Sequence, residues 1–140
     1  MLTPTSQHNP SLIITDRDLA RLRQVIDLHD TPSAEQLDSE LQRATVVDSR
    51  AVPPTVVTMH SEVVYEDRAT GERRTVAVVF PHEADAGRGK VSVLAPIGSA
   101  LIGLSVGQEI EWRVPGGRKR VRVVEIRYQP EASGSDRGVR

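Results

Sequence analysis

The amino-acid sequence predicts an α+β protein, in which a short N-terminal antiparallel helical hairpin precedes an antiparallel sheet with one short helix. Two observations support this fold class. Apolar residues recur at helical spacing between residues 12 and 51. In the following segments, apolar and polar residues alternate as they do in half-buried strands. The length of 140 residues, without internal repeats, suits one domain of ordinary size with at most a small appendage.

The first helix is expected to begin after Thr15. Residues 1–11 are polar and punctuated by proline, which predicts a flexible lead. The apolar run at residues 12–14 fits either a strand or a hydrophobic staple. Thr15 followed by Asp18 is a loose capping box. The apolar face of the helix consists of Leu19, Leu22, Val25 and Ile26, and the sequence HDTP at residues 29–32 ends it.

A second helix is expected from a capping box formed by Ser33 and Gln36. Its apolar face consists of Ala34, Leu37, Leu41 and Ala44. Two helices joined by so short a turn are expected to be antiparallel, with arms of roughly 20 Å at 1.5 Å per residue. A stiff Pro-Pro linker then separates a helical hairpin over residues 12–51 from a second domain over residues 52–128.

The second domain is expected to contain two hairpins and one short helix. Strands are predicted at residues 57–67 and 74–80, and a Gly-rich loop at residues 82–90 leads into a strand near Val91. Ser99 is the expected N-cap of a helix over residues 99–104. Residues 109–114 and 119–126 alternate around Pro115-Gly116-Gly117, which is typical of a β-hairpin. Residues 129–140 are expected to form a flexible tail.

One long stretch of the second domain supports a family assignment. This stretch resembles the C-terminal domain of the Gre-type transcript cleavage factors, and its sequence is APIGSALIGLSVGQEIEWRVPGG followed by VVEI. The positions in register are Pro96, Gly98, Ala100, Leu101, Gly103, Val106, Gly107, Glu109, Pro115, Gly116 and Gly117. Three further segments narrow the resemblance to the Rnk family, over roughly residues 11–134. They are the N-terminal helical pair, the segment VVTMHSEVVYED and the ending YQPEASG. The resemblance implies an FKBP-like sheet domain, RNA polymerase as the partner and, as a family-level term, DNA binding.

The strongest candidate site is the turn that the resemblance places on the rim of RNA polymerase. This docking loop consists of Ala95, Pro96, Ile97, Gly98 and Ser99. An apolar Pro-Ile knuckle beside a helix N-terminus suits a protein contact. The same residues also fit a purely structural turn with an N-cap.

Charge is segregated along the chain. Residues 27–40 carry five acids and no Lys or Arg, whereas residues 113–127 carry six bases against Glu125. Asp27, Asp30 and Glu35 are the hairpin-tip acids, which either solubilise the tip and contact a partner or help to hold Mg²⁺ as in the cleavage factors. Arg118, Lys119 and Arg120 form a basic edge, which is either a solvated hairpin tip or a grip for phosphates.

Catalysis and metal binding find little support in the sequence. There is no cysteine, the four histidines are scattered without metal-ligand spacing, and no G-x-S-x-G elbow is present. With four aromatic residues, the chain offers no stacking platform for single strands, so strong direct nucleic-acid binding is not expected. No signal peptide or membrane span is visible, and no cofactor is implied. A cytoplasmic protein that is not an enzyme is the expectation.

The sequence therefore predicts a regulator that binds RNA polymerase at its secondary channel without stimulating transcript cleavage, and that competes with Gre-type factors. The alternative, which the family name implies, is a regulator of nucleoside diphosphate kinase and nucleotide metabolism acting through another partner. The FKBP-like fold suggests prolyl isomerase activity as a third possible function. The active-site pocket of such isomerases is lined by aromatic side chains, however, and this chain has few.

Overall fold

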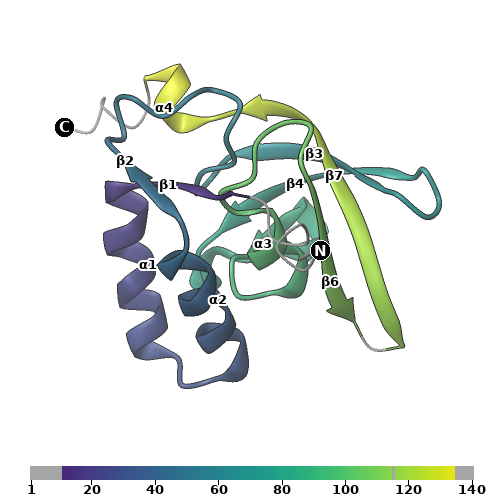
Figure 1. The fold of residues 1–140 in the computed structure, drawn as a ribbon, viewed down its shortest axis with the longest axis horizontal. Helices are drawn as coiled ribbons and strands as arrows, with labels where there is room; N and C mark the ends of the chain where they lie inside the picture. Colours follow the sequence, from purple (N-terminus) through teal and green to yellow (C-terminus); the bar gives the residue numbers. More distant parts are fainter. Residues whose placement is uncertain (1–10, 115, 135–140) are drawn as a thin grey trace, which may run out of the picture.

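A five-stranded sheet forms the centre of the protein (Figure 1). The computed structural model describes residues 11–114 and 116–134, without the side chains of residues 112–114. Most of the expected flexible lead, Pro115 of the hairpin turn, and residues 135–140 of the expected tail lie outside these ranges. Within them, helices and strands combine in an α+β fold, as the sequence predicts.

The sheet is mixed rather than purely antiparallel. Its strands are β3 (Glu62–Asp67), β4 (Arg73–Val79), β5 (Lys90–Ser92), β6 (Glu109–Val114) and β7 (Gly117–Tyr128). They lie in the order β5-β4-β3-β7-β6, and every neighbouring pair is antiparallel except β4 and β5. The expectation of an antiparallel sheet fails at this edge. The chain between β4 and β5 passes through two 3₁₀ turns, η2 (Pro81–Glu83) and η3 (Ala86–Arg88), and re-enters the sheet in the direction of β4.

Two helices, α1 (Asp16–Leu28) and α2 (Pro32–Gln42), lie side by side on one flank of the sheet (Figure 1). Thr15 caps α1 as predicted, because its Oγ1 accepts the N–H of Asp18 at 3.0 Å. The predicted cap of α2 is wrong. Thr31, rather than Ser33, accepts the N–H of Ala34 at 3.1 Å, since Pro32 takes the first helical position, where its missing N–H costs nothing.

The apolar run before α1 is a strand. β1 (Ile13–Thr15) pairs in parallel with β2 (Thr45–Val47), so the two ends of the helix pair are joined by a short two-stranded ribbon. The N–H of Ile13 also donates to the carbonyl of Gly103 at 3.0 Å. This ribbon fixes the base of the helix pair against the segment that follows the short helix α3 (Pro96–Leu101).

Strand β3 begins five residues later than predicted. The segment before it forms a buried turn, in which the N–H of Thr58 donates to Ser61 Oγ at 2.9 Å and the N–H of Ser61 donates to the carbonyl of Thr58 at 3.0 Å. His60 within this turn has φ of 70°, a left-handed conformation that no strand contains. Alternation of residue types in the sequence does not reveal such a turn.

The C-terminal segment is packed rather than loose up to residue 134. A short helix, α4 (Pro130–Ser133), follows β7, and the side chain of Gln129 is only 3% exposed. Its Nε2 donates to the carbonyls of Pro53 and Val56 at 2.9 and 2.8 Å. The expected flexible tail is therefore wrong for residues 129–134, because these bonds fasten them to the Pro-Pro segment.

The helix pair and the sheet share one hydrophobic core. Leu22 and Leu37 of the helices belong to the same cluster of contacting buried side chains as Val63, Val78 and Val123 of the sheet. Helix α1 has 13 residues, which corresponds to about 20 Å at 1.5 Å per residue. The arm length of roughly 20 Å agrees with the sequence-based expectation. The inner faces of both helices are buried in the shared core, so the helix pair lies along the domain rather than standing free of it.

Candidate functional site

The docking loop begins at the N-terminus of α3. Ala95 is the N-cap, and Pro96 occupies the first turn with its side chain exposed. Ser99, the predicted N-cap, lies inside the helix, where its N–H donates to the carbonyl of Ala95 and its Oγ to that of Pro96, at 2.9 and 3.2 Å. Ile97 is half-buried and packs against the core. Only Pro96 of the expected Pro-Ile knuckle is fully presented to solvent.

Gly98 holds this loop against the preceding strand. A Cβ at Gly98 would lie 2.0 Å from the carbonyl oxygen of Ser92 and 2.8 Å from its carbonyl carbon. Both are backbone atoms, so no side-chain rotation would relieve the overlap. The N–H of Ala95 donates to the same Ser92 carbonyl at 2.9 Å. The glycine therefore allows the α3 turn to lie directly on the end of β5, which fixes where Pro96 is displayed.

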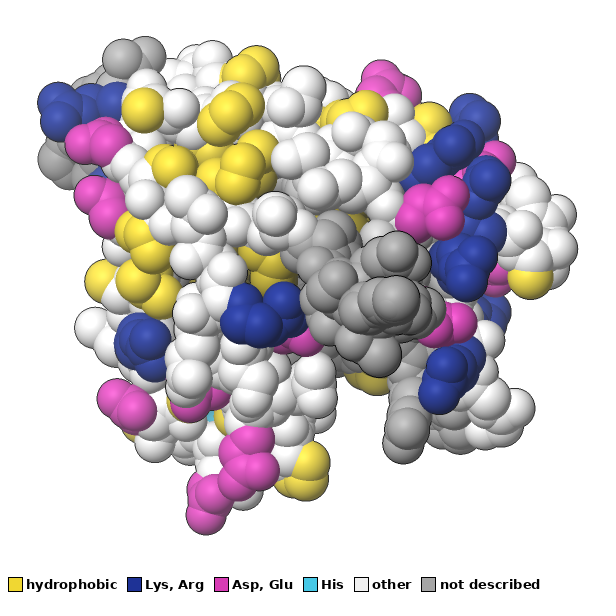
Figure 2. All heavy atoms as spheres, in the orientation of Figure 1, with side chains coloured by type: hydrophobic (Ala, Val, Ile, Leu, Met, Phe, Trp, Pro, Cys, Tyr) yellow, Lys and Arg dark blue, Asp and Glu magenta, His cyan; other side chains and the backbone are white. Residues whose placement is uncertain are grey.

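The hairpin-tip acids lie where α1 and α2 meet. The side chains of Asp27, Asp30 and Glu35 are exposed, and none forms a hydrogen bond or ion pair with a residue that the structure describes. The other two acids of this region are paired, Asp38 with Arg23 at 2.9 Å and Glu40 with Arg43. The tip also carries Leu28, which is 80% exposed. Its acidic character is visible at the lower left of Figure 2.

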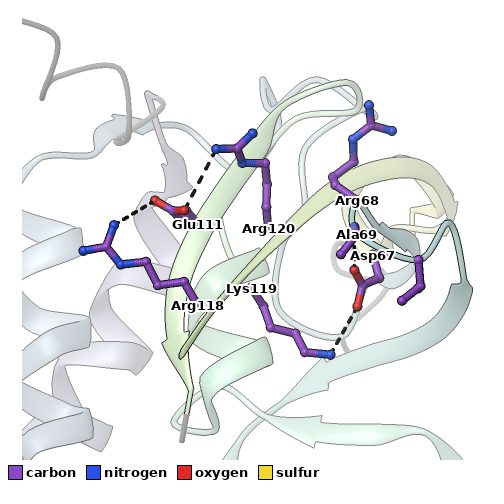
Figure 3. Close-up of a pocket in the computed structure, with 8 residues that line it drawn as sticks. Asp67, Arg68, Ala69, Glu111, Arg118, Lys119 and Arg120 are labelled. Atoms are coloured by element: carbon purple, nitrogen blue, oxygen red, sulfur yellow. Dashed lines mark hydrogen bonds and ion pairs between the residues drawn. The ribbon is translucent and has the colours of Figure 1, made fainter. Parts of the chain in front are cut away.

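The basic edge does not form one uninterrupted patch. Arg118 and Arg120 lie on the outer face of β7 and share the carboxylate of Glu111, at 3.6 and 3.9 Å. Lys119 points to the opposite side, as strand alternation requires, and donates to Asp67 Oδ2 at 3.2 Å (Figure 3). Bases still predominate on this side of the molecule, where Lys and Arg gather at the right of Figure 2.

These residues line a pocket of about 340 Å³ between the β3–β4 turn and β7 (Figure 3). Its eight lining residues are Asp67, Arg68, Ala69, Thr70, Glu111, Arg118, Lys119 and Arg120. Hydrogen bonds from the Ala69 N–H and from Lys119 lower the pKa of Asp67, so this carboxylate stays ionised. The sequence predicts a basic edge at the three bases of β7 but does not reveal the other lining residues, because only the sheet brings the β3–β4 turn beside β7.

A second missed group joins the helix pair to the sheet. Asp18 is 1% exposed, and its Oδ2 accepts the N–H of Met59 at 3.0 Å, while Oδ1 pairs with Arg21. The Arg21 guanidinium lies 5.3 Å from the centroid of the Phe80 ring, a cation–π contact. We call Asp18, Arg21, Met59 and Phe80 the helix-pair anchor. Its only sequence signal was the capping box, which predicts a helix start and not a tertiary contact.

A hydrogen bond between His60 and Glu83 supports the anchor from the sheet side. His60 Nε2 lies 2.8 Å from Glu83 Oε1, which also accepts the N–H of Phe80 at 3.1 Å. Burial alone would raise the pKa of Glu83, but the hydrogen bonds from His60 and Phe80 and the charges of His60 and His82 outweigh it and lower that pKa. Glu83 thus holds the η2 turn that presents Phe80 to Arg21.

The described residues offer no obvious metal site. Across residues 11–114 and 116–134, no three His, Asp or Glu side chains are arranged so that they could hold an ion. The tip acids in particular do not form such a group. None of the described helices has both the length and the apolar run that a bilayer crossing requires.

Comparison with protein families divides the chain near the Pro-Pro segment. Residues 52–128 match the family described as transcription elongation factor GreA/GreB, C-terminal domain, and residues 10–47 match the Rnk N-terminus. The first range contains the docking loop, the five-stranded sheet and the pocket. The second contains both helices and the tip acids.

Individual relatives agree with this division. The regulator of nucleoside diphosphate kinase from Escherichia coli K12 is 38% identical over 129 residues, which cover 89% of this chain and 95% of that protein. A solved structure, the prokaryotic transcription elongation factor GreA/GreB from Nitrosomonas europaea, is 43% identical with a TM-score of 0.71 and covers 85% of this chain and 99% of that one.

The similarity to GreA elongation factors extends over a shorter part of the chain. GreA from Pelobacter propionicus is 37% identical over 95 residues, which cover 68% of this chain but only 60% of that protein. These names describe regulators and elongation factors rather than enzymes. With an Rnk N-terminal segment, a GreA/GreB C-terminal domain and this degree of identity over nearly its whole length, the chain belongs to the Rnk family of regulators related to the Gre factors.

Proposed function

We propose that this protein binds RNA polymerase at the secondary channel, does not stimulate transcript cleavage, and competes there with Gre-type factors. The observation that carries the proposal is the docking loop. In a domain of the GreA/GreB type, Gly98 allows the α3 turn to lie on β5 with Pro96 exposed and Ile97 braced by the core. A rigid apolar projection of this kind suits a protein interface.

The tip of the helix pair supports the part of the proposal that excludes stimulation of transcript cleavage. Leu28 is exposed between Asp27 and Asp30, whose side chains pair with no described residue, so the tip offers both an apolar and an acidic contact. The tip nevertheless lies close to the domain, because the inner faces of α1 and α2 belong to the shared core. Ligation of a hard cation requires carboxylate oxygens within about 2.5 Å of the ion. A tip held this close to the domain would stop short of metal ions deep in a channel.

A variant of the docking loop tests whether the protein binds RNA polymerase through this loop. Pro96→Glu changes an exposed side chain at a helix position that accepts glutamate, so the fold should tolerate it. We expect at least tenfold weaker polymerase binding by surface plasmon resonance, the effect of losing about 1.4 kcal/mol of interface energy. The control is Pro54→Glu, the same change at another exposed proline, with binding unchanged. Equal binding by the Pro96 variant would remove the docking role of this loop.

A cleavage assay tests whether the protein stimulates transcript cleavage and whether it competes with Gre-type factors. Added to a backtracked elongation complex, the wild-type protein should give no cleavage above the intrinsic rate. It should reduce cleavage that an added Gre factor stimulates, through competition for one site. Direct stimulation that Asp27→Ala or Asp30→Ala abolishes would contradict the proposal, and so would failure to inhibit the Gre factor at saturating concentration.

A second function is favoured by the name of the Escherichia coli relative, a regulator of nucleoside diphosphate kinase. In this alternative the protein acts on nucleotide metabolism through a partner other than the polymerase. Co-purification with the tagged full chain separates the two. Polymerase subunits in the eluate support the first function, whereas the kinase alone supports the second. Either partner would place the protein in the cytoplasm.

A further inference from the structure

We infer that the pocket between the β3–β4 turn and β7 is a binding site for a compact polyphosphate group, a property separate from polymerase docking. The β3–β4 turn and β7, which carry most of the lining residues, lie across the molecule from the helix pair (Figure 1). The pocket also differs from the docking loop in every residue. Its occupation therefore does not depend on the function proposed above.

The frame of the pocket is fixed by backbone hydrogen bonds. The N–H of Arg68 donates to the carbonyl of Arg120 at 2.9 Å, which ties the turn to β7. Within the turn, the N–H of Gly71 donates to the carbonyl of Asp67 at 2.7 Å, and the N–H of Asp67 to that of Glu72 at 2.8 Å. The walls are thus held in place before any ligand arrives, which lowers the entropic cost of binding.

The side chains of the pocket favour an anion. Arg68 is engaged outside it, with Glu66 and Glu109 at 2.6 and 3.1 Å. The Asp67 carboxylate is held by Ala69 and Lys119. Arg118 and Arg120 remain, and their contacts with Glu111, at 3.6 and 3.9 Å, are longer than hydrogen bonds. Each guanidinium has five N–H donors, so both retain donors for a ligand oxygen.

Phosphate is the anion that this arrangement suits. Arg118 and Arg120 project from the same face of β7 at alternate positions, about 7 Å apart along the strand. That spacing applies to the α-carbons, and both guanidinium groups turn toward Glu111 (Figure 3). Two such groups on one side of the strand suit a ligand with several phosphate oxygens, because guanidinium groups bind phosphate in bidentate fashion. The hydroxyl of Thr70 adds a neutral donor to the lining.

The composition of the pocket argues against recognition of a nucleobase. A volume of about 340 Å³ is near the lower end for small-molecule sites, and no aromatic side chain is among the eight that line the pocket. A nucleobase would find no stacking partner in it. The site should therefore recognise the phosphate chain itself, with similar affinity for tripolyphosphate and for the triphosphate of any nucleotide.

Calorimetric titration of the full chain with tripolyphosphate, in metal-free buffer at low salt, tests the inference. We expect one saturable site, with clearly weaker binding of citrate, a polycarboxylate of comparable size. Arg118→Gln combined with Arg120→Gln should lower affinity at least tenfold, whereas Arg118→Lys with Arg120→Lys should lose less, because it keeps the charge but not the fork. The matched control is Arg127→Gln, an exposed arginine of the same strand outside the pocket, with affinity unchanged.

Four results would overturn the inference. The first three are absence of saturable binding, equal affinity for citrate and tripolyphosphate, and an equal loss of affinity in the Arg127 variant. The fourth is an affinity for single-stranded oligonucleotides that exceeds the affinity for tripolyphosphate and rises with oligonucleotide length. The last result would identify a nucleic-acid surface in place of a small-ligand site. Thermal midpoints of all variants should lie near that of the wild type, because the substituted side chains are exposed.

Discussion

The carboxylate of Asp18 on α1 accepts a 3.0 Å hydrogen bond from the backbone N–H of Met59, a residue 41 positions further along the chain. The same carboxylate pairs with Arg21, whose guanidinium lies over the ring of Phe80. Asp18 is almost fully buried, so these contacts are shielded from water. The helix-pair anchor therefore fixes the position of α1 on the sheet domain, and with it the position of the acidic tip.

Asp18→Ala should destabilise the protein by about 3 kcal/mol in equilibrium urea unfolding. The substitution leaves a buried N–H without an acceptor and removes the partner of Arg21. Asp38→Ala is the matched control, since Asp38 also pairs with an arginine but is partly exposed. It should cost less than about 1 kcal/mol. Equal losses for the two variants would show that the anchor adds nothing to an ordinary surface ion pair.

Gly98→Ala should cost about 3 kcal/mol or more in the free energy of unfolding. The added Cβ would overlap the Ser92 carbonyl at 2.0 Å, and the backbone of β5 would have to shift. Gly87→Ala is the control, because a Cβ at Gly87 would lie 3.6 Å from Asp85 Oδ1, which is ordinary van der Waals contact. A change within about 0.5 kcal/mol is expected there. Should Gly98→Ala be equally mild, the close approach of α3 to β5 is wrong.

Gln129→Ala should lower the free energy of unfolding by about 2 kcal/mol. The change removes two hydrogen bonds, to the carbonyls of Pro53 and Val56, and leaves the buried Val56 carbonyl without this donor. Gln42→Ala is the control, as Gln42 is exposed and makes one long contact of 3.4 Å to Asp38. Hydrogen exchange at the Thr55 and Val56 amides should rise only in the Gln129 variant. Unchanged protection would contradict the role of Gln129.

The lowered pKa of Glu83 predicts a loss of stability in acid. A carboxyl whose pKa is lower in the folded state stabilises the fold fully above its unfolded pKa, near 4.5, and this contribution is lost as pH falls through the folded value. The urea midpoint of the wild type should therefore drop between about pH 5 and pH 3. Glu83→Gln cannot titrate, so its midpoint should fall less over this range.

The control for this titration is Glu62→Gln. Glu62 is exposed, and its side chain makes no hydrogen bond or ion pair with a described residue. Its variant should follow the wild-type pH profile. If Glu83→Gln also follows that profile, the hydrogen bonds of the Glu83 carboxylate to His60 and Phe80 do not support the η2 turn in solution.

Local patterns in the sequence determined the type of most elements, because each depends on neighbouring residues alone. Thr15 caps α1 through an N–H three residues away, and the apolar spacing of Leu22 and Val25 sets the buried face of that helix. The alternation around Val121 and Val123 likewise marks the inward face of β7. The stretch from Pro96 to Gly117 was sufficient to identify the GreA/GreB type of C-terminal domain, whereas the Rnk family needed the other segments of the chain as well.

Only the tertiary structure decided how these elements are placed and what lies between them. The capping pattern at Asp18 contains no information that its carboxylate reaches Met59. The polar ending around Gln129 likewise resembles a flexible tail, although the Gln129 amide donates to the Pro53 and Val56 carbonyls. The pocket at Arg118 and Arg120 arises because β3 pairs with β7 and brings a distant turn beside them. Such contacts join residues far apart in sequence, and their energy depends on burial, which no local pattern specifies.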